Sequence, residues 1–324
     1  MQEVSVSQHI PPKAVSAVGS VRLKDPSKAD FCYDRYYCSS YSWGEKFPAC
    51  HPVNGIHHSP INLDGNMTRN KSLEEIHLIG FDKAPPGQWK LRNTGYSVVL
   101  DLGSNLAVHG GGLPGTYRTV QLHFHWGDST MNGSEHTVNG RRYPMEMHIV
   151  SIKSIYQNLT EAMHDPSGLA VLGVFIDVGD LDNENFTVIS NLVPSVAYKG
   201  KSVAMKPFPL LNLLPAQNMS RFYRYHGSLT TPPCSQIVMW TVYEVPIYVS
   251  QQQIDAFAAG IYYSEEGANK TLLQRNFRHI HETFTREVYA SRDATLVSIL
   301  AVASPCSTVD LVLLALPLLI SCLP

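Results

Sequence analysis

The segment Gln121–Trp126 alternates polar and apolar side chains, and this alternation restricts the folds that can contain it. On a β-strand successive side chains point to opposite faces, so His123 and His125 share one face while Leu122 and Phe124 share the other. Two imidazoles on the same face of a strand can bind one metal ion. The segment therefore predicts a strand with one apolar face and one metal-binding face.

A second segment, Glu146–Val150, carries a third imidazole at His148. Three neutral histidine nitrogens leave a fourth metal position open, as in catalytic zinc sites, whereas structural zinc sites fill all four positions. Gln121 and Glu146 each lie two residues before a histidine, so each shares its face and can accept the second ring N–H. Histidines two apart on a strand more often fill surface or core positions, but the acceptors behind them favour one Zn²⁺ per chain, held by His123, His125 and His148.

The rest of the pattern predicts a single, predominantly β domain between residues 31 and 290. No repeat, low-complexity tract or long linker divides this region. Short apolar or alternating runs predict five strands, and one amphipathic run predicts a helix. The strands are expected at Tyr96–Leu100, Val120–Trp126, Met145–Ile152, Leu169–Val178 and Gln236–Val245, and the helix at Gln251–Tyr262.

The overall charge gives no sign of a nucleic-acid partner. The formal net charge is -2 and the pI is about 6.7, so the chain has no general attraction for polyanions or anionic lipid. We expect its partners to be recognised at a specific site.

The C-terminal segment 291–324 reads as a glycosylphosphatidylinositol (GPI) signal that is removed on attachment of the anchor. The run Leu311–Ile320 is apolar but too short to span a bilayer, which needs about 20 residues. The attachment residue could be Ser291, Ser298 or Ser304. The alternative, a C-terminal core helix, is disfavoured because Pro317 interrupts the run.

Two further features indicate secretion. Four cysteines precede the candidate anchor sites, an even set that suits an oxidising compartment, although four cysteines allow three pairings. One feature disagrees with secretion, because residues 1–30 lack a signal peptide. Either the true start of the chain lies upstream, as we expect, or the chain is not secreted. Acceptor sequons for N-glycosylation occur at Asn66, Asn70, Asn132, Asn158, Asn185, Asn218 and Asn269.

Seven sequence blocks make the chain resemble the α-class carbonic anhydrases. They occur in the order of the family across about residues 40–290. The blocks are SPINL at 59–63, GTYR at 115–118, QLHFHWG at 121–127, GSEHTV at 133–138, EMHIV at 146–150, LAVLGVF at 169–175 and GSLTTPPC at 227–234. The resemblance implies one domain built on a large, mostly antiparallel sheet with short peripheral helices.

The resemblance also implies a zinc lyase that interconverts carbon dioxide and bicarbonate through a zinc-bound hydroxide. The zinc histidines would be supported by Gln121, Glu146 and the backbone carbonyl of Asn276. Thr230 would orient the hydroxide and donate its own proton to Glu135. The substrate pocket would be formed by Val150, Val171, Leu229, Val238 and Trp240, with Thr230 and Thr231 contacting the anion.

Within the family, the chain resembles the extracellular, GPI-anchored carbonic anhydrase four subgroup. This implies disulfides Cys32–Cys38 and Cys50–Cys234, an anchor on Ser291, and a position on the outer face of the plasma membrane. Sulfonamides and anions are the inhibitors expected of such an enzyme.

One position departs from the family pattern. Fast members carry a proton-shuttle histidine in the segment Asn-x-Gly-His, and here this position is Tyr96. A phenol with a pKa of about 10 transfers protons poorly at neutral pH compared with an imidazole of about 6.5. We expect slow, buffer-limited proton transfer.

Two other functions fit the sequence less well. A catalytically weak binding module of the same fold would be expected to lack a zinc histidine or the Thr230–Glu135 pair, and this chain keeps all five residues. An unrelated zinc hydrolase would carry a motif such as His-Glu-x-x-His, which the sequence lacks.

Overall fold

The structure, a computed structural model, describes residues 31–33, 38–54, 57–103 and 105–296. These residues belong to one compact unit. The predictions made for residues 1–30 and for 297–324, including Ser298, Ser304 and the apolar run, lie outside the described residues. Within the described ranges, no helix has both the length and the apolar character needed to cross a membrane.

Short helices and many strands make up the described chain. The α-helices are α1 (Trp43–Lys46), α2 (Leu159–Ala162), α3 (Glu184–Ser190) and α4 (Gln251–Ala258), and the 3-10 helices are η1 (Pro48–Cys50), η2 (Pro52–Asn54), η3 (Val193–Val196) and η4 (Leu210–Leu213). The strands are β1 (Asn62–Leu63), β2 (Thr68–Arg69), β3 (Ile76–Ile79), β4 (Trp89–Asn93), β5 (Val98–Asp101), β6 (Ala107–Gly110), β7 (Tyr117–Trp126), β8 (Thr137–Val138), β9 (Arg141–Arg142), β10 (Met145–Lys153), β11 (Leu169–Gly179), β12 (Ser202–Met205), β13 (Phe222–Gly227), β14 (Val238–Tyr243), β15 (Ile247–Ser250) and β16 (Val288–Ala290).

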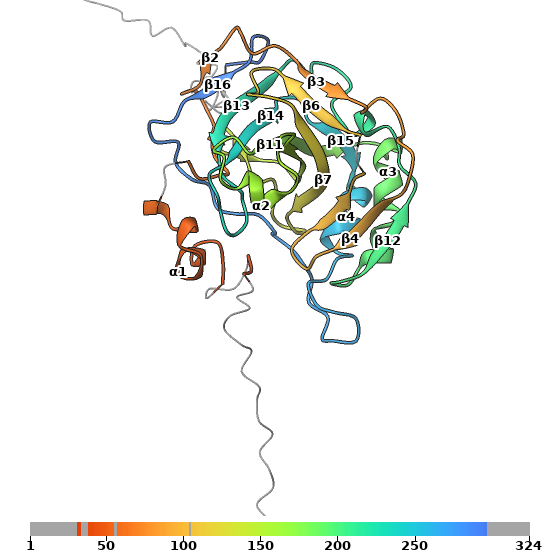
Figure 1. Cartoon of the computed structure of the whole chain (residues 1–324). Coiled ribbons are helices and arrows are strands. Elements are labelled where there is room, and N and C mark those ends of the chain that lie inside the picture. Colours follow the sequence, from red (N-terminus) through yellow and green to blue (C-terminus); the bar gives the residue numbers. More distant parts are fainter. Residues whose placement is uncertain (1–30, 34–37, 55–56, 104, 297–324) are drawn as a thin grey trace, which may run out of the picture. The chain divides into compact units, whose positions relative to one another are not determined.

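Thirteen of the described strands form one large sheet (Figure 1). Its main order is β12-β4-β5-β7-β10-β11-β14-β13-β16-β2, with β15 beside β11, β6 beside β7 and β3 beside β6. The β11–β14, β11–β15 and β16–β2 pairs are parallel and the others are antiparallel. The predicted class, a predominantly β domain on a large and mostly antiparallel sheet, is confirmed.

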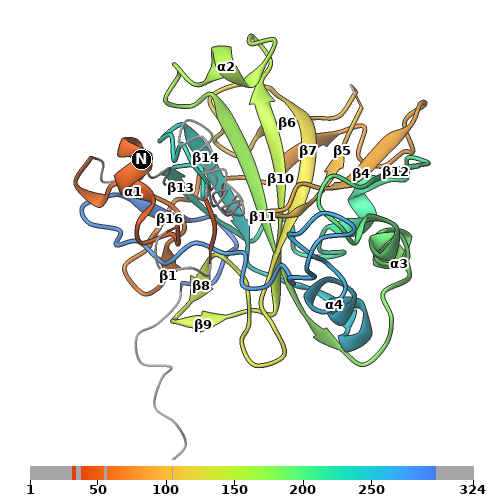
Figure 2. The ribbon, with the colours of Figure 1, turned by 90° about the horizontal axis from the view of Figure 1, so that it is seen from below.

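The alternation in β7 separates two hydrophobic cores, one on each face of the sheet. Leu122, Phe124 and Trp126 lie in the larger core. There α3 and α4 cover the sheet (Figure 2). The Phe124 ring lies 5.1 Å from that of Phe257 on α4. The opposite face, which carries His123 and His125, borders the second core. The sheet thus provides an apolar support behind the metal-binding face.

The predicted elements are present with shifted ends. The strand expected from Tyr96 begins at Val98, because Thr94 to Ser97 form a turn in which the Thr94 hydroxyl accepts hydrogen bonds from the Tyr96 and Ser97 N–H groups. The helix expected to reach residue 262 ends at Ala258. Its start is fixed by a capping box between Ser250 and Gln253.

Both implied disulfides, Cys32–Cys38 and Cys50–Cys234, are formed. The second joins positions 184 residues apart and ties the segment around η1 to the loop that carries Thr230. Within that loop the Cys234 N–H donates to the carbonyl of Thr231. The bridge therefore braces the loop on which the predicted Thr230 and Thr231 lie.

Removal of the two disulfides should have unequal effects on stability. In the chain-entropy model, a loop of 184 residues corresponds to about 5 kcal/mol and one of 6 residues to about 2 kcal/mol. We expect the Cys50→Ser/Cys234→Ser variant to lose more free energy of unfolding than the Cys32→Ser/Cys38→Ser variant, measured by denaturant titration. A larger loss of free energy of unfolding in Cys32→Ser/Cys38→Ser would contradict this ranking of the two disulfides.

Candidate metal centre

Three histidines meet on the face of the sheet opposite α3 and α4. In the antiparallel pairing of β7 with β10, His148 lies directly opposite His123 and Glu146 lies opposite His125. The His125 ring centroid lies 5.0 Å from that of His123 and 4.6 Å from that of His148. One ligand nitrogen from each histidine lies within 4.8 Å of the other two. The three predicted ligands are therefore brought together.

Each histidine is oriented by a hydrogen bond to its second ring nitrogen. His123 Nδ1 lies 3.1 Å from Gln121 Oε1, His125 Nδ1 donates to the Asn276 carbonyl at 2.7 Å, and His148 Nε2 lies 2.7 Å from Glu146 Oε1. This leaves His123 Nε2, His125 Nε2 and His148 Nδ1 for a common ligand. His125 Nε2 is buried and has no hydrogen-bond partner, so the donor set fits a metal ion that prefers nitrogen, such as zinc.

The protonation state also suits metal binding. Burial, followed by the neighbouring His125 and His148, lowers the pKa of His123 well below its usual value, and burial lowers the pKa of His125. At neutral pH both rings are neutral, which is the form that binds metal. His125 and His148 are buried but His123 is partly exposed, so the site opens on the His123 side.

Glu146 is the centre of a buried hydrogen-bond network that includes His136, a residue that sequence reasoning missed. Glu146 Oε1 lies 2.7 Å from both His148 Nε2 and His136 Nδ1, and the His136 backbone N–H donates to Oε2 at 2.8 Å. His136 Nε2 lies 2.6 Å from the Tyr225 hydroxyl. Burial would raise the pKa of Glu146, but His136 and His148 outweigh it and hold the pKa low. The sequence feature that could have pointed to His136 is the GSEHTV block at 133–138, which contains it.

Glu135 lies at the metal site, but the predicted bond with Thr230 is not formed. The Arg278 backbone N–H donates to Glu135 Oε1 at 2.8 Å. Oε2 is buried without a hydrogen-bond partner and lies 3.5 Å from His125 Nε2 and 3.9 Å from His148 Nδ1. This oxygen is directed at the metal-binding nitrogens, with the Thr230 hydroxyl not bonded to it.

The five apolar positions predicted for the substrate pocket fall in one hydrophobic cluster. Its buried members include Val171, Val238 and Trp240, and the partly buried Val150 and Leu229 pack against them. Adjacent strands place Val150 opposite Val171, which is opposite Trp240. The Trp240 ring lies 4.8 Å from the His148 ring, so this apolar wall borders the metal centre. Thr231 is partly exposed.

Tyr96 lies in the turn between β4 and β5, with its ring stacked on Phe31. The two ring centroids are 4.2 Å apart and nearly parallel. The Lys199 ammonium lies 5.7 Å from the Tyr96 centroid.

Ser291 is part of the folded domain. Its side chain is fully buried, its N–H donates to the Phe222 carbonyl at 2.9 Å, and its hydroxyl donates to the Ser220 carbonyl at 2.6 Å. Ordered contacts continue to Thr295, whose N–H donates to Glu244 at 2.7 Å.

The glycosylation acceptors lie on the surface. Asn70 is partly exposed, and the other six, Asn66, Asn132, Asn158, Asn185, Asn218 and Asn269, are exposed.

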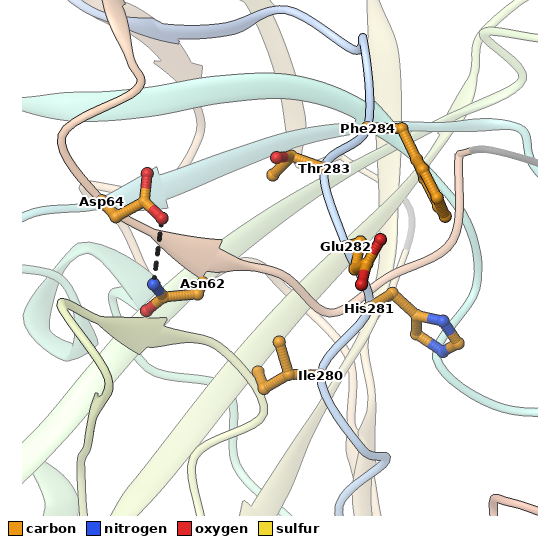
Figure 3. A pocket seen from close by; sticks show the side chains of 7 residues that line it. All are labelled: Asn62, Asp64, Ile280, His281, Glu282, Thr283 and Phe284. Atoms are coloured by element: carbon orange, nitrogen blue, oxygen red, sulfur yellow. Dashed lines mark hydrogen bonds between the residues drawn. The ribbon is translucent and has the colours of Figure 1, made fainter.

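A separate surface pocket is lined by Asn62, Asp64 and residues 280–284 (Figure 3). None of the predicted ligands or substrate residues lines that pocket.

Comparison with known proteins agrees with this geometry. The family model for eukaryotic-type carbonic anhydrase matches residues 38–292. The chain is 36% identical to mouse carbonic anhydrase 15 over 84% of this chain and 86% of the relative, and 34% identical to rabbit carbonic anhydrase 4 over 87% and 90%. It is also 34% identical to human receptor-type tyrosine-protein phosphatase zeta, over 77% of this chain but 11% of that protein. The chain therefore belongs to the eukaryotic-type carbonic anhydrase family.

Proposed function

We propose that the protein is a zinc enzyme that reversibly hydrates carbon dioxide to bicarbonate and a proton. The observation that carries the proposal is the set of three histidines whose second nitrogens are all bonded, leaving one nitrogen of each for a metal ion. A zinc ion held there would supply an activated water, because zinc lowers the pKa of its water to about 7, a value for which carbonic anhydrase is the standard example.

One side of the metal centre is bordered by an apolar wall. The wall of Val150, Val171, Leu229, Val238 and Trp240 suits carbon dioxide, which is small and uncharged, and excludes competing polar ligands from that side.

We assign Thr230 the role of orienting the attacking water, with Thr231 contacting the anionic product. In this role Thr230 donates its hydroxyl proton to Glu135 Oε2, which is the unpartnered oxygen at the site. This requires the Thr230 side chain to turn toward Glu135.

A binding module without catalysis is the second candidate, and the match to a receptor-type phosphatase shows that relatives of this domain occur in larger proteins with other names. The complete set of histidines and hydrogen-bond acceptors favours the enzyme, since a purely adhesive surface does not require buried, oriented imidazoles.

We further propose that the protein acts at the extracellular face of the plasma membrane. Two disulfides, seven accessible sequons and similarity to carbonic anhydrases 4 and 15 support this location. The burial of Ser291 argues against attachment of the GPI anchor at this residue and favours the other two candidates, Ser298 and Ser304.

Substitution of one zinc histidine should abolish hydration. We expect His125→Ala to lower zinc occupancy and to reduce carbon dioxide hydration, followed by stopped-flow, by at least about 100-fold, because loss of even an outer hydrogen-bond partner costs 10–100-fold. His77→Ala, an exposed histidine on β3, is the matched control and should retain both. Full activity in His125→Ala would refute the proposal.

Tyr96→His should relieve a limit set by proton transfer. At low buffer concentration we expect hydration to rise by about tenfold, since a positioned proton-transfer group contributes on the order of 10²–10⁴. The gain should shrink as buffer concentration increases. Tyr96→Phe is the control and should resemble the wild type; equal buffer dependence in Tyr96→His and wild type would exclude Tyr96 as the limiting position.

The anchor site can be separated from the folded domain by mutation. Ser298→Pro/Ser304→Pro should reduce the protein released from cells by phosphatidylinositol-specific phospholipase C, because an attachment site requires small residues. Ser291→Thr, which keeps the hydroxyl but enlarges the side chain, should leave release unchanged. Loss of release in Ser291→Thr at unchanged thermal stability would instead place the anchor on Ser291.

A further inference from the structure

An ion pair between Arg92 and Asp101 lies beside the open side of the metal centre. Across the sheet, Arg92 on β4 is opposite Val99 on β5, and Val99 is opposite His123 on β7. Asp101 is opposite Gln121, the hydrogen-bond partner of His123. Directly opposed residues share a face, so Arg92 lies on the metal-binding face, two strand spacings or about 10 Å from His123.

The guanidinium of Arg92 is held in place yet remains accessible. Its Nε and one terminal nitrogen donate to the two Asp101 oxygens at 2.7 and 2.9 Å, and the two side chains are 38% and 40% exposed. A guanidinium has five N–H donors, and we find no other hydrogen-bond partner for it within the described part of the chain. An exposed ion pair of this kind stabilises a fold by at most about 1 kcal/mol, so the pair contributes little to the free energy of unfolding.

Cations outnumber carboxylates around this pair. Lys90 is exposed and lies opposite Asp101 on β4, and the Lys199 ammonium lies over Tyr96 in the adjoining turn. Lys201, two residues after Lys199, forms an ion pair with Glu266, so this pair contributes no net charge to the region. The excess positive charge and the free donors of Arg92 favour a small dianion.

We propose that Arg92 docks an anionic proton acceptor of the hydrogen phosphate class at the mouth of the metal centre. The inference rests on the proposed function, because carbon dioxide hydration releases a proton that Tyr96 carries poorly. Arginine is suited to phosphate because its planar fork matches two phosphate oxygens. Hydrogen phosphate takes up one proton and leaves as dihydrogen phosphate, and the drop in charge from -2 to -1 weakens its attraction to Arg92 and favours release.

Substitution of Arg92 and substitution of Asp101 should change the phosphate dependence of hydration in opposite directions. We expect Arg92→Gln to raise the phosphate concentration that gives half-maximal stimulation of hydration by about 3–10-fold relative to the corresponding imidazole concentration, at constant ionic strength. Asp101→Asn should lower the same ratio, since it frees the guanidinium. Arg118→Gln, on β7 outside the site, is the matched control. A change in the same direction for both variants, or no change in either, would overturn the proposal.

A binding readout separates this proposal from the enzyme assignment. Phosphate titration of the zinc-loaded protein should shift the NMR signal of the Arg92 Nε–H group, and the shift should saturate at lower phosphate in Asp101→Asn. An unmoved Arg92 signal would overturn the anion site even if hydration were rapid. Absence of hydration in every buffer would overturn the enzyme assignment, while the Arg92 signal would still decide the anion site.

Discussion

The pairing of β7 with β10 is the constraint on which the rest of the site depends. A single register places His148 opposite His123 and Glu146 opposite His125. Because side chains alternate along a strand, a shift of β10 by one residue against β7 would turn His148 to the face opposite His123 and His125. The apolar residues that alternate with the histidines on β7, Leu122 and Phe124, are fully buried in the core beneath α3 and α4 and so hold the register.

The same register solves an electrostatic problem. A buried carboxylate is costly unless it is bonded, and Glu146 is bonded by His148, by the His136 ring and by the His136 backbone. Glu146 can therefore remain charged inside the domain and hold His148 with one nitrogen turned toward the metal position. The network continues through His136 to Tyr225, which anchors it on β13.

Much of this arrangement was predictable from short sequence patterns. The period of two in Gln121–Trp126 predicted both the strand and the shared face of its histidines, and the spacing of Gln121 and Glu146 predicted their hydrogen bonds. The Asn276 carbonyl followed only from family resemblance, because no local pattern links positions 125 and 276. The same is true of the Cys50–Cys234 bridge.

Other features could not be predicted because they depend on contacts between distant segments. The role of His136 requires Tyr225 and Glu146 together, and the burial of Ser291 depends on its bonds to Phe222 and Ser220. The Arg92–Asp101 pair joins two strands whose register is set by the turn at Thr94–Ser97. A sequence pattern predicts which side chains share a face of a strand, whereas the tertiary fold determines which of these faces come into contact.

X-ray absorption at the zinc edge of the zinc-loaded protein tests the central claim, that three histidine nitrogens hold the metal. We expect one zinc per chain with three imidazole nitrogens and one oxygen at about 2.0–2.2 Å and no sulfur. A sulfur shell, or a spectrum with fewer than three imidazoles, would contradict it.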